Sequence, residues 1–484
     1  VAALFGGESM HYGPYKKSLA LVAMAVSGTF FALSAQALDF NQCVAMALKQ
    51  NPQMMAAKAE QAEAKGAVSQ ARGHLLPKLN ASFSASQSNN ALTVFGMKLS
   101  QRQATFNDFG ASQFNPSNPN SLNVAPAGLN LPGSYHNYGT KLQLEIPIWN
   151  GGEIWGRLSQ AHAMLEAAQS GNIMARQKLT FAVLQAYDSV IAAESAIQVA
   201  HKAQKAAESY VKTSKLLLDK GVLVKSDWLA AEVNLEKAQL AVQTAENDHA
   251  NALENLSILI GWPEEKTLSV GKPVQPALPD HSLLDLQRQA MTENAGIVAL
   301  RHKLKAAQDG IQVARAAYLP HVNAMANQEW NGSSLGNAAP SYTVGGEVTW
   351  NVLDFSRGGG MDRAQAEREQ AMAALQEAQD KLRLQVAEVW RGAREAALRV
   401  KMRRLAVQQM EESQRLVRLR YENGVETITG LLHGQAELDQ SRAELVSADY
   451  AEAVQRAALL LAIGKLNPQE IVDVAPVSVV EGAS

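Results

Sequence analysis

The chain has 484 residues, which is enough for two or three ordinary domains. Its formal net charge is −2 and it has no clustered basic stripe with interleaved aromatic residues, so nucleic-acid binding is disfavoured. It has one cysteine, Cys43, which excludes an intramolecular disulfide and a cysteine-rich metal site.

The first predicted element is a leader sequence. Lys16 and Lys17 precede the apolar run SLALVAMAVSGTFFAL, and the small residues AQA at 35–37 fit the A-x-A cleavage rule. We expect residues 1–37 to contain a Sec-type signal peptide that starts at Met10 and is cleaved after residue 37, with an upstream stretch before the true start. A membrane anchor is the alternative, but the run is short for a span of ~20 residues. Later apolar segments carry charges every turn or two, so entry into a membrane would have to use strands.

Three stretches of the chain recur later in the same order. The pairs are AVSQARGHLLPKLNASFSAS (67–86) with GIQVARAAYLPHVNAMANQ (310–328), KLQLEIPIWNGGEIWGRLSQA (141–161) with GGEVTWNVLDFSRGGGMDRAQA (345–366), and DKGVLVKSDWLAAEVNLEKAQ (219–239) with ENGVETITGLLHGQAELDQS (422–441). This order predicts a tandem duplication, 38–262 and 283–464, with a Pro-rich linker over 263–282 and a tail over 465–484.

Each half is predicted to contain two strands with a period of two. Apolar residues at 79, 81, 83 and 85 alternate with polar ones, as do those at 142, 144, 146 and 148 and those around 342–352. A half-buried soluble sheet gives the same pattern. Four strands are too few to cover a core of their own, however, so a membrane-facing sheet is favoured. Aromatic residues at the strand ends fit an interfacial girdle: Trp149, Trp330, Tyr342 and Phe355.

Long helices make up most of the remaining chain. They are predicted over about 39–75, 153–220 and 226–260 in the first half and 283–319, 362–423 and 426–463 in the second. The longest spans about 100 Å at 1.5 Å per residue, more than a globular domain. Ala196, Ala200, Ala203 and Ala207 place small residues on one helical face, which favours close coiled-coil contact. The glycine-rich stretch SRGGGMD at 356–362 lacks the P-loop lysine, and the repeat places it at a corner between strand and helix.

These features together resemble the TolC family of outer-membrane efflux proteins. The resemblance rests on the signal peptide, the duplicated halves, the LP before a strand, IPIWNGG before a long helix, and the turns KGVLVKSDWLAAE and YENGVETITGLLHGQAEL. It implies a mixed α/β membrane protein that forms a homotrimer in the outer membrane. Each protomer would give four strands to a 12-stranded transmembrane β-barrel in outer-membrane lipid, continued by an α-helical coiled-coil tunnel across the periplasm. It also implies a passive export duct that works with a periplasmic adaptor and an inner-membrane transporter, in efflux or type I secretion.

The resemblance places two functional regions at the far ends of the long helices. Small apolar residues at the turns would contact the adaptor, and the equivalent positions are Gly221, Val222 and Leu223, and Gly424, Val425 and Glu426, where Glu426 departs from the family pattern. In the family the second helical hairpin constricts the entrance, so Arg415, Arg418 and Tyr421, at i, i+3 and i+6, are the gate candidates on one face. Glu411, Glu412 or Glu422 would then pair with the arginines in a closed ring, and a solvated helix face is the alternative.

The sequence contains no catalytic constellation, and we expect no enzyme activity, no cofactor and no metal site. Two other classes of protein compete with the duct. A soluble periplasmic coiled-coil scaffold or adaptor would also have long hairpins and a signal peptide, but adaptors carry one hairpin in β-rich domains. An enzyme with an elongated helical domain would need a catalytic motif.

Overall fold

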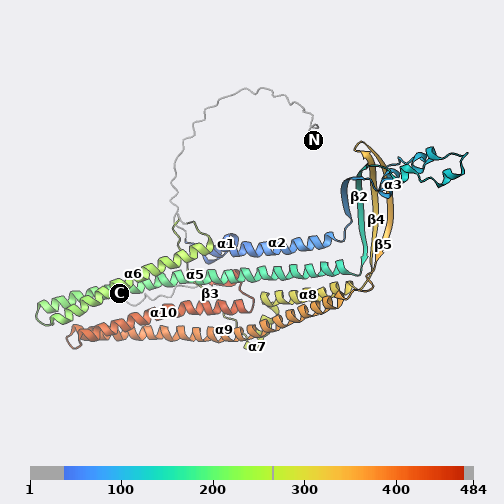
Figure 1. Ribbon diagram of the computed structural model, residues 1–484. Helices are drawn as coiled ribbons and strands as arrows, with labels where there is room; N and C mark the ends of the chain where they lie inside the picture. Colours follow the sequence, from blue (N-terminus) through green and yellow to red (C-terminus); the bar gives the residue numbers. More distant parts are fainter. Residues whose placement is uncertain (1–36, 264–265, 474–484) are drawn as a thin grey trace, which may run out of the picture. The chain divides into compact units, whose positions relative to one another are not determined.

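The computed structural model of the protein describes residues 37–263 and 266–473. The expected signal peptide, apart from its last residue, and the end of the tail lie outside the described residues. The two halves have the predicted order of elements (Figure 1). The first half contains α1 Phe40–Gln50, α2 Pro52–Gly73, β1 Lys78–Ser88, β2 Tyr135–Asn150, α5 Glu153–Asp219 and α6 Lys225–Ile260. The second contains α7 Leu283–Glu293, α8 Ala295–Ala316, β4 His321–Ser334, β5 Asn337–Thr349, α9 Ser356–Glu422 and α10 Ile428–Ala462.

Each half begins with two helices where the sequence analysis predicts one, and an asparagine makes the break in both. Asn51 and Asn294 have extended backbones, with ψ of 130° and 117°. Each side chain accepts a hydrogen bond from the backbone N–H two residues later, at 2.9 Å. The side-chain amide of Asn51 donates to the carbonyl of Leu259, and that of Asn294 to the carbonyl of Ala462. Both carbonyls belong to the last turn of a helix, where they have no partner within it. Each asparagine therefore ties the short helices to the end of a hairpin.

The long helices α5 and α9 each span 67 residues and pair with α6 and α10 as antiparallel hairpins. α5 matches the predicted 153–220, whereas α9 begins six residues before the predicted 362–423. Buried residues of α9 recur every seven positions: Val386, Ala393, Val400, Val407, Gln414 and Tyr421. Leu431, Leu438, Leu445, Glu452 and Leu459 do the same in α10. This spacing confirms the predicted coiled coil for the second hairpin. In the first, Ala200 and Ala207 of the predicted small-residue face are buried.

The predicted glycine corner before α9 is wrong. Gly358, Gly359 and Gly360 lie inside the first turns of α9. The chain turns earlier, over 350–355, where the carboxylate of Asp354 accepts a hydrogen bond from the backbone N–H of Ser356 at 2.9 Å. That acceptor satisfies one of the free N–H groups at the start of a helix, so α9 begins there.

The four strands form one antiparallel sheet in the order β1-β2-β4-β5. A tight turn at Leu335 and Gly336 joins β4 to β5, whereas the long insertion 89–134 joins β1 to β2. The insertion contains α3 Ala91–Ser100, α4 Ala127–Asn130 and the 3-10 helices η1 Phe106–Phe109, η2 Ala111–Gln113 and η3 Pro119–Asn123. In a second sheet, β3 Val274–Pro276 of the linker pairs with β6 Ile471–Asp473 of the tail, next to η4 Pro468–Glu470.

The apolar core lies where the short helices meet the middle of the long ones, away from the four-stranded sheet. Phe40 of α1 packs edge-on against Tyr187 of α5, with ring centroids 5.8 Å apart. Cys43 is fully buried in this core, and burial raises the pKa of its thiol to about 12. The sheet consequently depends on something other than this core to cover its apolar side.

Candidate conduit and periplasmic entrance

The four-stranded sheet has one polar and one apolar face, and both are continuous across the strands. The register places Asn80, Gln143, Asn327 and Thr343 in one row and Leu79, Leu144, Ala326 and Val344 in the next. On the polar face Lys141 pairs with Glu329 at 3.5 Å. On the apolar face Val344 is 73% exposed and Tyr342 is 80% exposed. The predicted alternation is thus confirmed, and the apolar face has no cover within the described chain.

A bulge in β2 turns Trp149 to the apolar face. The register passes from Pro147 opposite Asn323 to Trp149 opposite Val322, so Ile148 has no opposite residue. Because Pro147 has no N–H for the ladder, the interruption falls next to it.

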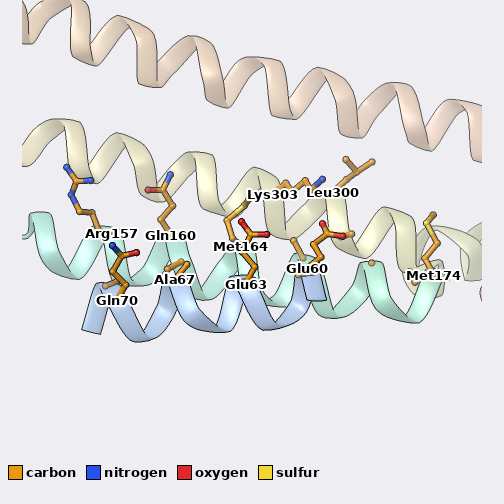
Figure 2. A pocket seen from close by; sticks show the side chains of 18 of the residues that line it. Glu60, Glu63, Ala67, Gln70, Arg157, Gln160, Met164, Met174, Leu300 and Lys303 are labelled. Carbon is orange, nitrogen blue, oxygen red and sulfur yellow. The ribbon is translucent and has the colours of Figure 1, made fainter. Parts of the chain in front are cut away.

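A concavity of about 1510 Å³ continues the polar face onto the helices. α2, α5, α8 and α9 pack side by side in this order, and all four contribute to its wall. Its sheet end is lined by Lys78 and Glu145, which face each other in the register. Figure 2 shows Glu60 and Glu63 on α2 and Lys303 on α8 along the same groove. The concavity therefore joins the polar face of the sheet to the helices.

The predicted tip residues occupy two equivalent turns at the ends of α5 and α9. Gly221 and Gly424 both have φ of 72°, a left-handed conformation that suits glycine. The next residues, Val222 and Val425, donate backbone hydrogen bonds five residues back, at 2.9 Å each, which is the Schellman pattern. Both valines are 71% exposed. Glu426 instead turns its carboxylate to the backbone N–H of the next residue, at 3.1 Å.

The half-buried Leu223 completes the first of these turns. The turns thus present the apolar tips that the resemblance implies, and their contact with an adaptor stays a prediction.

The three gate candidates do not share one face. Arg415 forms two hydrogen bonds with Glu412, at 2.8 and 2.7 Å, and these lower the pKa of that carboxyl. Arg418 pairs with Glu422 at 3.0 Å. Both arginines are exposed, whereas Tyr421 is buried against the other hairpin. Positions i and i+6 are about 120° apart on an α-helix. Tyr421 belongs to the row of buried α9 residues that recurs every seven positions, which we call the seam, and both arginines lie outside this row.

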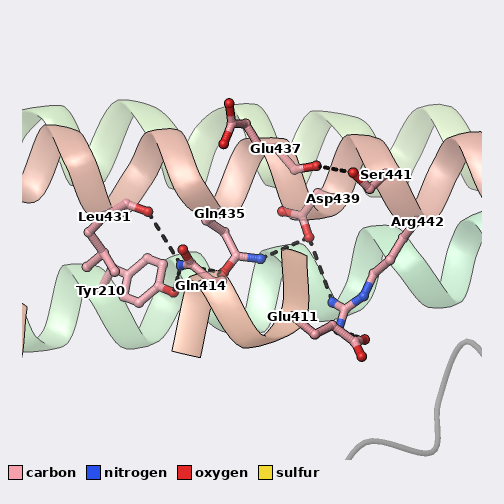
Figure 3. Close-up of polar contacts among 9 residues, drawn as sticks. All are labelled: Tyr210, Glu411, Gln414, Leu431, Gln435, Glu437, Asp439, Ser441 and Arg442. Atoms are coloured by element: carbon pink, nitrogen blue, oxygen red, sulfur yellow. Dashed lines mark hydrogen bonds and ion pairs between the residues drawn. The ribbon is translucent and has the colours of Figure 1, made fainter. Parts of the chain in front are cut away.

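Three buried polar side chains, which the sequence analysis missed, connect the two hairpins next to this region (Figure 3). The hydroxyl of Tyr210 on α5 donates to the Oε1 atom of Gln435 on α10 at 3.0 Å. The amide of Gln414 on α9 donates to the same two oxygens, at 3.0 and 3.1 Å. We call these three residues the hairpin latch. Gln414 occupies a seam position, so the heptad spacing was the signal in the sequence that could have found it.

A charged extension continues from the hairpin latch along α10. Gln435 donates to Asp439 at 2.9 Å, and Arg442 contacts Asp439 at 4.0 Å and Glu411 of α9 at 2.8 Å. Burial raises the pKa of Asp439 to about 6, against the opposing effect of its hydrogen bond and of Arg442. Burial likewise raises the pKa of Tyr210. Of the three carboxylates expected as possible partners of the gate arginines, Glu411 instead pairs with Arg442 and joins the two helices of one hairpin.

None of the helices in the described residues is long and apolar enough to cross a membrane. Over 37–263 and 266–473, no group of three or more histidine, cysteine, aspartate or glutamate side chains is placed to hold a metal ion.

A sheet with one apolar and one polar face, continued by a groove into long helical hairpins, fits a duct that crosses a membrane. The model of the outer membrane efflux protein family matches residues 43–262 and 286–465, and the chain belongs to this family. It is therefore an outer-membrane channel that extends into the periplasm, as the resemblance implied, and is neither an enzyme nor a soluble scaffold.

Two sequence relatives and one solved structure agree with this assignment. Protein CyaE of Bordetella pertussis is 28% identical over 341 residues, 67% of this chain and 70% of that protein. Alkaline protease secretion protein AprF of Pseudomonas aeruginosa is 24% identical over 197 residues, 40% of each chain. The Campylobacter jejuni CmeC outer membrane channel matches with a TM-score of 0.72 at 16% identity, over 88% of this chain and 85% of that one.

Proposed function

We propose that three copies of the chain close one twelve-stranded barrel that carries the export path through the outer membrane. The observation that carries this proposal is the pair of free edges. In the described residues, β1 and β5 each have a partner on one side only. Unpaired N–H and C=O groups are not tolerated in lipid, so an open sheet cannot sit there, and closure by identical copies removes every edge.

The two faces of the sheet then have distinct roles. The polar face lines the lumen and meets the groove of the helices, while the apolar face contacts lipid. Trp330, Tyr342 and, through the bulge, Trp149 lie on the apolar face, which supports an aromatic girdle. Phe355 lies directly before α9 and is 89% exposed, at the helical side of the sheet.

The tandem duplication explains why the two halves repeat their details. The family model matches twice, and the asparagine breaks and the glycine turns occur at equivalent places. With two similar hairpins per protomer, a trimer would have a tunnel wall of six hairpins around the threefold axis.

The hairpin tips would contact a periplasmic adaptor, and an inner-membrane transporter would supply the energy. The duct itself is passive. Among the two cargo classes, secreted protein or small molecules, the name of the relative AprF, a secretion protein, favours secreted protein. Comparison of the secreted proteins of wild-type and deletion strains would test this, and loss of drug resistance alone, with an unchanged secretome, would contradict it.

The entrance would be held closed by the hairpin latch and the arginines beside it. In a threefold ring Arg415 and Arg418 would come near their copies, and Glu412 and Glu422, which already pair with them, would reduce the repulsion. Opening would then require the first and second hairpins of a protomer to separate at the hairpin latch.

Neighbouring residues of β5 provide a matched test of the barrel. Lysine at Val344 would face lipid and cost about 2–4 kcal/mol near the middle of the membrane, whereas lysine at Thr343 would face the lumen. We expect Val344→Lys to reduce heat-sensitive trimers and Thr343→Lys to retain them, as measured by cross-linking in mild detergent. Monomers alone in the wild type, or release into the soluble periplasm, would overturn the proposal, as would equal behaviour of the two variants.

A further inference from the structure

The insertion 89–134 has no counterpart between β4 and β5 and lies at the end of the sheet away from the long helices (Figure 1). α3 follows β1, an edge strand, and leads into Gln101, Arg102 and Gln103. We call these three residues the strap. They determine how the insertion sits on the sheet.

The strap crosses the sheet from strand to strand on its polar side. The amide of Gln101 donates to the carbonyl of His136 at 2.9 Å and to the side chain of Asn137 at 2.8 Å. Asn137 points to the polar face, because it lies opposite Ser86 and donates to the side chain of Asn331 at 3.0 Å. Gln101 is itself only 5% exposed. The start of the strap is thus buried against the face that we assign to the lumen.

The rest of the strap reaches the far edge of the sheet. Gln103 accepts a hydrogen bond from the hydroxyl of Tyr135 at 2.6 Å and donates to Ser333, beside the β4–β5 turn, at 3.3 Å. Arg102 donates to the carbonyl of Pro340 on β5 at 2.8 Å. Consecutive residues therefore contact β2, β4 and β5.

Backbone strain shows that these contacts fix the strap. Among the described residues, Arg102 is the non-glycine residue with a positive φ, 56°. Such a conformation costs on the order of 1–3 kcal/mol and persists where surrounding contacts hold it.

The insertion is almost uncharged and exposes several large apolar side chains. Its charged residues are Lys98, Arg102 and Asp108, and Lys98 pairs with Asp108. Large apolar side chains remain open to solvent: Leu92 at 80%, Phe106 at 86%, Leu122 at 76% and Leu131 at 83%. An apolar surface of this kind is normally covered by a partner.

We propose that the insertions of three copies pack against one another through these apolar side chains and form a lid across the outer mouth of the barrel. The lid rests on the proposed trimer. In that trimer the polar face turns toward the axis, and the strap brings the insertion to the same side. Lipid lies behind the opposite face, so it does not reach this surface. Threefold symmetry places the same patch of each copy around the axis, which makes the copies its partners.

Cysteine cross-linking distinguishes the lid from its alternatives. The native Cys43 is fully buried and can stay. Leu131→Cys and Phe106→Cys should give covalent oligomers with a short bis-maleimide, resistant to boiling in detergent. Phe83→Cys, 60% exposed on the apolar face of β1, should not. If trimers persist on native gels but neither insertion variant cross-links, the lid is wrong, and cover by the outer leaflet or by another protein becomes the explanation. Loss of trimers in the wild type would instead contradict the barrel.

A second measurement tests the strap in the assembled channel. The double variant Gln101→Ala and Gln103→Ala should free the insertion and raise single-channel conductance in planar bilayers. Asn118→Ala removes a side chain that bonds only within the insertion, to the N–H of Asn120, and should leave conductance unchanged. Wild-type conductance in the strap variant would overturn the lid.

Discussion

Replacing Tyr210 by phenylalanine removes one oxygen from the contact between the two hairpins and leaves the ring in place. That oxygen makes two buried hydrogen bonds, to Gln435 and from Gln414. After its removal the two glutamines still bond each other, at 3.1 Å, and Gln414 still reaches the carbonyl of Leu431 at 3.4 Å. The Oε1 atom of Gln435 and the Nε2 atom of Gln414 therefore keep a partner. The loss of stability is limited to the net contribution of the two hydrogen bonds of the hydroxyl.

The expected size follows from those two bonds. Each contributes about 0.5–1.5 kcal/mol, so Tyr210→Phe should favour separation of the hairpins by about 1–3 kcal/mol. Because each 1.4 kcal/mol is a factor of ten in an equilibrium constant, the ratio of open to closed entrances should rise between about fivefold and about 140-fold.

Single-channel recording in planar bilayers measures this ratio as the time spent in the high-conductance state. Tyr421→Phe is the matched control, since it removes a hydroxyl at the same level of burial that lies 3.4 Å from the Ser214 hydroxyl and so makes one long contact. Its effect should be smaller. Both variants should first form normal trimers. If Tyr210→Phe then opens no more often than Tyr421→Phe, or no more often than the wild type, the hairpin latch does not hold the entrance closed.

Three further predictions concern the tips, the arginines and the buried carboxyl. Leu223→Glu should abolish export while trimers remain intact, whereas Leu240→Glu, 68% exposed on the side of α6, should not; export by both variants would count against tip docking. Arg415→Ala with Arg418→Ala should raise conductance and reduce anion preference, and no change in either would place these arginines on the outer surface. Burial raises the pKa of Asp439 to about 6, above its ordinary ~3.9, so the folded state binds a proton more readily and stability should fall as the pH rises from about 4 to 6. Asp439→Asn should flatten that slope in thermal unfolding relative to the wild type, and parallel profiles would contradict it.

The elements themselves were readable from the sequence because their periods are unambiguous. A period of two placed Leu79 and Val344 on one face, and the register bears this out. The turns at Gly221 and Gly424 were predicted because glycine adopts a positive φ without strain. Helix breaks were harder. Asn51 precedes a proline, which disfavours helix at the preceding residue, but Asn294 precedes an alanine and breaks the helix through its cap and its bond to α10.

The face on which Tyr421 lies was not predicted correctly, because local spacing is ambiguous on a long helix. Separations of three residues group Tyr421 with Arg415 and Arg418. The seven-residue repeat groups it with Gln414 instead, and the structure follows that repeat. The strap was not accessible to such reasoning at all, because Arg102 and Pro340 lie far apart in the chain and meet only after the sheet has formed.

The seam of the second hairpin changes character near its tip, and this change is what would make an entrance able to open there. Val386, Val400 and Val407 fill the seam with apolar side chains, but the next position along α9 is Gln414. Burying a valine stabilises by about 1.5–3 kcal/mol, whereas a hydrogen bond exchanged with water contributes about 0.5–1.5 kcal/mol net. Separation at Gln414 also exposes amide groups that can form hydrogen bonds with water, whereas separation at Val407 exposes only apolar side-chain atoms. The contact at Gln414 should therefore cost less to break than the apolar seam beside it, so the proposed separation of the two hairpins could leave α9 and α10 paired at Val407.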